Sequence, residues 1–167
     1  MGDVPTAREV DRLRKLGAEP MTLKPSKVLM AAADLLEKGW CQRYLGVRET
    51  ATHWIAAKRM GLPLYLGAHE FQPGMEIDRV CLQGAIMKAA VDLTGMGWPA
   101  KSDHAMTPEQ EAMRASYTVA ELAVADEINR RGTVTGTARW NDVVGRTQAE
   151  VVALVRDVAA REEAAGR

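Results

Sequence analysis

Hydrophobic residues recur at three- and four-residue intervals along much of the chain, which is the spacing of helices that bury one face. Positions 4–16 follow this spacing and are expected to form a short helix that Gly17 ends. A second helix is predicted from Ser26, which would cap it, to Gly39, which would stop it. Its buried face would consist of Val28, Leu29, Ala32, Leu35 and Leu36.

The middle of the chain mixes short extended segments with helices. Residues 40–47 are too few and too aromatic for a helix, so we expect them to be extended and to pair with residues 64–66. The intervening residues 49–60 are expected to be helical. Asp78 would then cap a helix that ends at Gly95. The buried face of that helix would contain Cys81, Leu82, Ala85, Ile86 and Ala89.

A capping box begins the next helix. Thr107 and Gln110 have the spacing in which each side chain bonds the other residue's backbone N–H, and a proline follows the threonine. The helical spacing continues to Gly132, with a break near Ser116 as one option. Residues 133–140 are rich in threonine and are expected to be extended or loop.

A second capping box, Thr147 with Glu150, begins the last helix. Asp157 and Arg161, one turn apart on this helix, are expected to form an exposed ion pair. The core-facing residues would be Val151, Leu154, Val155 and Val158.

These elements predict a mainly α fold: one compact domain of about five to six helices with at most a small β hairpin. The length of 167 residues suits a single globular domain over positions 1–167. Residues 1–25 would form an N-terminal helical extension, and residues 26–160 would form the core.

Composition and charge exclude several function classes. The 22 basic and 22 acidic residues give no surplus for nucleic-acid binding, and Arg130 with Arg131 is more typical of a helix C-terminus than of a basic patch. The sequence contains no apolar run of membrane-spanning length and no signal-peptide core, so we expect a cytoplasmic protein without membrane contact. The scattered cysteines and histidines predict neither a metal site nor a cofactor.

Cys81 is the one candidate for catalysis. A cysteine in the first turn of a helix has a lowered thiol pKa and is a better nucleophile, with His53, His69 or His104 as a possible base. The alternative, which we favour, is a buried structural thiol, because Cys81 shares an apolar face with Leu82.

Two polar segments are the candidates for binding. In the segment around positions 140–146, polar side chains on a fixed loop would face a ligand or partner. Alternatively, these side chains only form turns, and Trp140 anchors the loop to the core. The segment around positions 40–42 follows a helix stop, and its alternative is a packed aromatic beside a satisfied amide. The candidate binding residues are Trp40, Gln42, Trp140, Asn141, Asp142 and Arg146.

Four motifs together resemble those of domain-of-unknown-function family 6197, small proteins of actinobacteria and phages. The resemblance covers about Ser26 to Ala160, and the segment 49–75 departs from the family pattern by being longer. It implies a small helical domain with no established activity, and it transfers no catalytic role to Cys81. The motifs are Gly39-Trp40-Cys41-Gln42, Val80-Cys81-Leu82-Gln83-Gly84-Ala85-Ile86, Trp140-Asn141-Asp142 and Gly145-Arg146-Thr147.

The sequence therefore favours a non-catalytic binding or accessory module that acts through protein contacts, with a protein partner or by self-association. A phage or mobile-element origin, including a phage structural or assembly component, belongs to this hypothesis. Two alternatives stay open: a Cys-dependent hydrolase or transferase that uses Cys81, and a small-ligand binder with a pocket walled by Trp40, Trp140 and Asn141.

Overall fold

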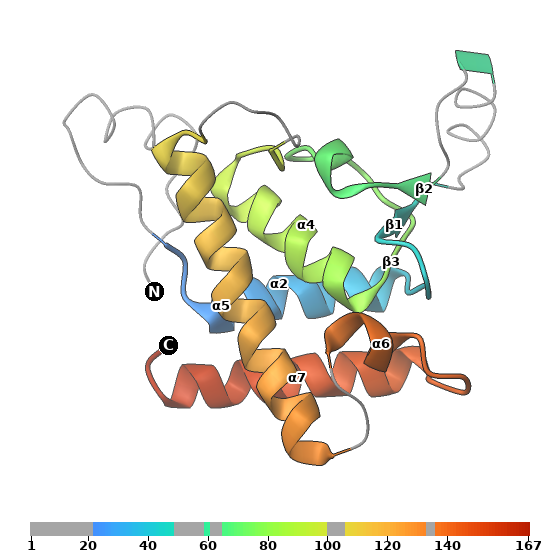
Figure 1. Ribbon diagram of the computed structural model, residues 1–167, viewed down its shortest axis with the longest axis vertical. Coiled ribbons are helices and arrows are strands. Elements are labelled where there is room, and N and C mark those ends of the chain that lie inside the picture. Colours follow the sequence, from blue (N-terminus) through green and yellow to red (C-terminus); the bar gives the residue numbers. More distant parts are fainter. Residues whose placement is uncertain (1–21, 49–58, 61–64, 100–105, 133–135) are drawn as a thin grey trace.

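The computed structural model describes residues 22–48, 59–60, 65–99, 106–132 and 136–167, and within these ranges the fold is mainly α (Figure 1). The helices are α2 (Pro25–Lys38), α4 (Leu82–Thr94), α5 (Pro108–Arg131), α6 (Thr137–Asn141) and α7 (Gln148–Ala164). The strands are β1 (Gly46–Val47), β2 (Tyr65–Leu66) and β3 (Arg79–Val80), and a short 3-10 helix spans Ala68–Glu70. The helices predicted over 4–16 and over most of 49–60 lie outside the described residues.

Helix α2 is the central packing element. It lies along α7 and also contacts α4 and α5, while α5 runs beside α4 and crosses over α2 and α7 (Figure 1). The predicted apolar face of α2 is buried except for Leu35, which packs at the edge of the core. The last carbonyl groups of α2 accept hydrogen bonds from the Gln148 side chain, at 2.6 Å from Leu36 O and 3.1 Å from Glu37 O. The start of α7 therefore satisfies backbone groups that the end of α2 leaves unpaired.

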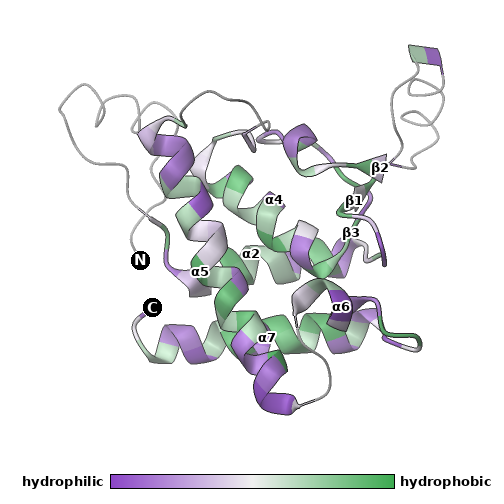
Figure 2. Ribbon diagram, in the orientation of Figure 1, coloured by the Kyte–Doolittle hydropathy of each residue, from purple (hydrophilic) through white to green (hydrophobic). Residues whose placement is uncertain are grey.

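The core is built from aliphatic side chains with few aromatics. Figure 2 shows α4 coloured as hydrophobic over much of its length, whereas hydrophilic and hydrophobic positions alternate on α5. Phe71 and Trp140 are the large aromatic rings of the core, at 0% and 3% exposure. The buried ammonium of Lys88 on α4 is paired with Asp92 one turn later, as a buried charge requires.

The predicted helix ends agree with the structure at several positions. Thr107 and Gln110 form the expected capping box, as do Thr147 and Glu150. Gly132 ends α5 in a left-handed conformation, with φ of 73°. The break that was one option near Ser116 is absent, because α5 is continuous there. The Ser116 hydroxyl donates to Ala112 O, one turn earlier in the same helix.

Several predicted details are wrong. Helix α2 begins at Pro25 with Lys24 as its N-cap, so Ser26 lies inside the first turn and does not cap it. Residues 137–141 are helical as α6 and are not a loop. Arg161 does not pair with the Asp157 carboxylate, because its guanidinium reaches the buried carboxylate of Glu127 instead.

The extended segments form a three-stranded antiparallel sheet in the order β2-β1-β3, which is larger than the predicted hairpin. The expected pairing of β1 with β2 is present, with Gly46 opposite Leu66. The prediction that all of residues 40–47 are extended is wrong, because residues 42–45 bend and only 46–47 form a strand. Strand β3 also has a parallel bridge to Trp40 on its other edge. The backbone N–H of Asp78 bonds to Val47 O of β1, and that of Val80 bonds to Gly39 O after α2. Because the chain is extended through β3, α4 begins only at Leu82 and Asp78 is not its cap.

Gly84 allows the first turn of α4 to lie directly against the sheet. A Cβ atom at this position would overlap the Leu45 carbonyl oxygen, so a side chain cannot be added without moving backbone. The start of α4 can thus lie close to Leu45, the residue before β1, whose carbonyl accepts a hydrogen bond from Cys81 N at 3.3 Å. Within the described residues, no helix is both long enough and apolar enough to cross a membrane.

We expect Leu29→Ala to destabilise the fold by about 2–5 kcal/mol, because it removes a fully buried side chain and leaves a cavity. The measurement is urea unfolding followed by circular dichroism. The matched control is Leu122→Ala on α5, where the leucine is 53% exposed and the loss should stay below about 1 kcal/mol. Equal losses for the two variants would contradict this assignment of the core.

Candidate functional site

Asn141, the last residue of α6, is the centre of a polar cluster. Its side chain is 1% exposed, and its Oδ1 accepts hydrogen bonds from Trp40 Nε1 at 2.8 Å and from Leu82 N at 3.1 Å. Its Nδ2 donates to Cys41 O at 3.2 Å and to Asp142 Oδ1 at 2.9 Å. Two accepted and two donated bonds use the full capacity of an amide.

The neighbouring side chains add further bonds between the same segments. Gln42 Nε2 donates to Asn141 O at 2.9 Å and to Val143 O at 3.1 Å. Asp142 Oδ1 accepts from Arg43 N at 2.9 Å. Arg43 has a φ of 71°, a left-handed conformation that a non-glycine residue adopts at a cost. The Asp142 carboxylate therefore supports a strained turn.

Arg146 closes the cluster on its other side. Its guanidinium carbon lies 3.8 Å from the centroid of the Trp140 ring, a cation–π arrangement, and its Nε donates to Trp140 O at 3.2 Å. It also forms an ion pair with Glu150 at 3.5 Å. We call the six residues of this cluster the polar junction: Trp40, Gln42, Trp140, Asn141, Asp142 and Arg146.

The structure thus brings together all the candidate binding residues that the sequence singled out. Their polar groups bond chiefly to one another and to nearby backbone, and together they join α6 to the segment after α2 and to the start of α4. This arrangement can fix three segments in place. Their role in binding a ligand stays a prediction.

Cys81 is the N-cap of α4, not a residue of its first turn. Its Sγ accepts a hydrogen bond from Gly84 N at 3.3 Å, and the residue is 6% exposed. Burial raises the pKa of the thiol to about 11, and the backbone hydrogen bonds from Gly84 and Gln83 offset only part of this effect. The lowered thiol pKa expected for a nucleophile is therefore absent.

The surroundings of Cys81 are apolar. It packs in a small buried cluster with Cys41 and Val47, and both cysteines are free thiols. Of the three candidate bases, His53 and His104 lie outside the described residues, and His69 lies in the 3-10 helix. In the described part of the chain, no three His, Cys, Asp or Glu side chains gather as metal ligands.

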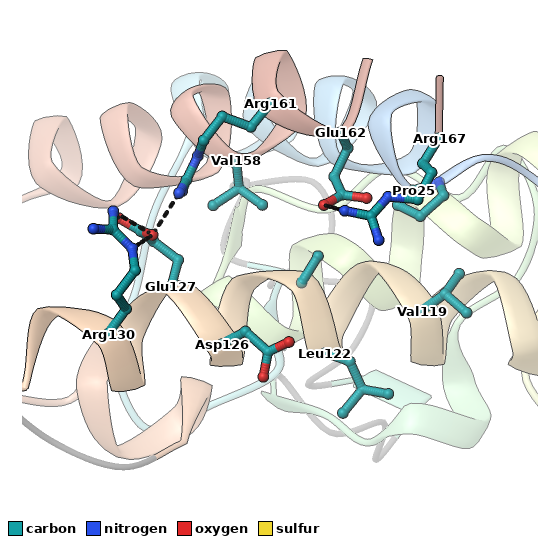
Figure 3. Close-up of a pocket in the computed structure, with 11 residues that line it drawn as sticks. Pro25, Val119, Leu122, Asp126, Glu127, Arg130, Val158, Arg161, Glu162 and Arg167 are labelled. Carbon is teal, nitrogen blue, oxygen red and sulfur yellow. Dashed lines mark hydrogen bonds and ion pairs between the residues drawn. The ribbon is translucent and has the colours of Figure 1, made fainter. Parts of the chain in front are cut away.

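A groove that the sequence analysis did not anticipate lies between α5 and α7, beside the start of α2 (Figure 3). We call it the α5–α7 groove; its volume is about 450 Å³. Val119 and Leu122 of α5 are 38% and 53% exposed. The lining residues are Pro25, Val119, Leu122, Ala123, Asp126, Glu127, Arg130, Val158, Arg161, Glu162 and Arg167, none of which belongs to the polar junction.

Buried carboxylates with arginine partners form the charged part of this groove. Glu127 is 4% exposed and bonds to Arg130, Arg131 and Arg161, the last at 2.7 Å (Figure 3). Burial alone would raise the pKa of Glu127, but the hydrogen bonds from Arg131, Arg161 and Arg130 outweigh it and lower the pKa to about 2. The carboxylate therefore stays charged and keeps its arginine partners.

A signal for the groove is present in the sequence of α5. Its buried face includes Ala120, Val124 and Ile128, which recur every four residues along the helix. Val119 and Leu122 lie off that face, so they are apolar residues that the core does not need. Apolar residues on a second side of a helix either pack against another segment of the chain or form an exposed apolar surface. The tertiary structure is needed to distinguish these two cases.

The model of a family of unknown function, DUF6197, matches residues 20–161 of the chain. This match confirms the resemblance that the sequence motifs indicated. Neither the curated proteins nor the solved structures include a match to this chain.

We expect Asn141→Ala to destabilise the protein by about 2–4 kcal/mol, because the buried Leu82 N–H loses its side-chain acceptor and the half-buried indole N–H of Trp40 and the Cys41 carbonyl each lose a hydrogen bond. Urea unfolding measures the effect. The control is Asn129→Ala, an exposed asparagine of α5, which should change stability little. A loss below about 1 kcal/mol for Asn141→Ala would show that the junction is not structural.

We expect Cys81 to react slowly with iodoacetamide in the native protein at pH 7, because a thiol pKa of about 11 leaves roughly one thiolate in ten thousand. Peptide mass spectrometry measures labelling at Cys81 separately from Cys41. Denatured protein, in which both thiols should label fully, is the control. Rapid native labelling of Cys81 would revive the nucleophile hypothesis.

Proposed function

We propose that this chain, which belongs to the DUF6197 family of unknown function, is a non-catalytic module that binds another polypeptide in the α5–α7 groove. The observation that carries the proposal is the pair of exposed apolar side chains, Val119 and Leu122, at the edge of a groove. The charged residues of this groove are held in ion pairs, such as that of Arg161 with Glu127. Exposed apolar groups beside a charged rim are typical of protein-binding surfaces. A cytoplasmic setting and a phage or mobile-element origin belong to the same proposal.

The alternatives have less support from the geometry. The Cys81 thiol is buried and its pKa is raised, which disfavours a Cys-dependent hydrolase or transferase. A small-ligand pocket walled by Trp40, Trp140 and Asn141 would need polar groups free to reach a ligand, and the amide of Asn141 is fully occupied. A protein-binding role makes no demand on either region.

Photo-crosslinking tests the proposal. We would replace Val119 with the photoreactive residue p-benzoylphenylalanine, produce the full chain in its own cells and irradiate them. The control carries the same residue at Val144, which is 94% exposed and lies outside the groove. We expect a crosslinked polypeptide at position 119 that is absent at position 144.

A second change ties the crosslink to the groove. Leu122→Lys places a charge on the apolar side of the groove and should abolish the adduct, while circular dichroism should show an unchanged fold because the leucine is exposed. If position 119 gives no adduct beyond that of position 144, the groove does not bind a polypeptide and the proposed function is wrong.

A further inference from the structure

We propose that the partner segment in the α5–α7 groove is an acidic amphipathic helix, with an apolar stripe against α5 and carboxylates against the arginines of the rim. This inference rests on the proposed function and names the chemistry of the partner. It follows from the spacing of the apolar residues, the exposure of the arginine side chains and the burial of two of the carboxylates beneath them.

The apolar side of the groove has the spacing of a helix-binding surface. Val119, Leu122 and Ala123 of α5 lie at positions i, i+3 and i+4, so they form one stripe along the helix. From Val119 to Arg130 the stripe and its charged end extend over roughly 16 Å at the usual rise per residue. A partner helix of about three turns matches this length and would place its own apolar stripe against these side chains.

The charged side of the groove presents arginines outward. The side chains of Arg130, Arg161 and Arg167 are 69%, 49% and 66% exposed, whereas their carboxylate partners Glu127 and Glu162 are 3% and 12% exposed. Figure 3 shows Arg130 and Arg161 converging on Glu127, with Arg167 beside Glu162 at the other end. The buried carboxylates of Glu127 and Glu162 thus fix the positions of the exposed guanidinium groups.

These guanidinium groups retain donors for a partner. Each has five N–H groups. Arg167 uses one donor atom, Nη2, in its bond to Glu162, while Arg130 uses two, Nε and Nη2, in its bonds to Glu127. Arginine binds carboxylates through pairs of parallel N–H bonds, so the remaining donors favour acidic side chains. The lining contains three arginines and three carboxylates, but Asp126 is the one carboxylate among them that is exposed, so positive side chains outnumber negative ones on the exposed part of the groove.

The charge pattern distinguishes this partner from a basic one. A lysine-rich helix on the same stripe would meet the exposed guanidinium groups of Arg130, Arg161 and Arg167, and like charges at an interface reduce affinity. An uncharged helix would gain from Val119 and Leu122 but leave the arginine donors to water. The geometry therefore favours carboxylates flanking an apolar stripe.

Peptide binding to the full-length protein tests the inference. The probe is a fluorescein-labelled helical peptide of about 18 residues, with a leucine stripe and flanking glutamates. The comparison peptide has lysines in place of the glutamates. By fluorescence anisotropy at low salt we expect the acidic peptide to bind at least about tenfold more tightly, and added salt to reduce this difference.

Variants locate the binding and its charge dependence. Leu122→Asp should weaken the acidic peptide by about tenfold or more, whereas Val144→Asp, a control at a side chain 94% exposed outside the groove, should not. The double variant Arg130→Gln with Arg167→Gln should remove the preference between the two peptides; it leaves Arg131 and Arg161 on Glu127, so the fold keeps these pairs. Circular dichroism verifies that each variant is folded.

Each other outcome overturns the inference. Equal or tighter binding of the lysine peptide, or no binding of either peptide, would show that the groove does not select acidic helices. Light scattering that finds a dimer, abolished by Leu122→Asp, would make a second copy of the chain the occupant. In these cases a crosslink from position 119 would still support the proposed function, and its absence would refute both.

Discussion

The side-chain amide of Asn141 is the constraint on which the arrangement of this fold depends. One buried group bonds to Trp40, to the backbone of Cys41 and to the first N–H of α4, so it holds together segments about 60 and 100 positions away in the chain. A buried amide gains from such bonds only when all are formed at once, because each unpaired group would carry its full desolvation cost. The placement of α6, the turn after α2 and the start of α4 are therefore fixed together, and α7 follows α6 directly.

The features that the sequence predicted depend on residues close together in the chain, whereas those that it missed depend on residues far apart. The capping boxes at Thr107 and Thr147 involve partners three residues away, so their spacing is visible in the sequence. The start of α4 is different, because Asp78 has a good capping side chain but its backbone N–H bonds to Val47 O in the sheet. A thiol, that of Cys81, then caps the helix, which no capping preference would have selected.

The candidate site shows the same division. The residues of the polar junction were identified as polar and aromatic side chains of a predicted loop and of the segment after a helix stop. Their convergence depends on contacts that no local spacing encodes. The interpretation of Arg130 and Arg131 as a helix terminus was incomplete, because both also bond to Glu127. Arg161 of α7 also bonds to Glu127 and not to the exposed carboxylate of Asp157. A buried carboxylate needs charged partners more than an exposed one, because water does not solvate it. The α5–α7 groove results from this packing and has no motif of its own.

The pKa of Glu127 is depressed by the arginines that surround its carboxylate. With a pKa of about 2, this carboxylate is ionised at every pH that a cell experiences, and its arginine partners are protonated throughout that range. The lining contains neither histidine nor cysteine. Moderate acidification would consequently leave the Glu127 ion pairs with Arg130, Arg131 and Arg161 in the same charge state, so this part of the rim would keep its geometry.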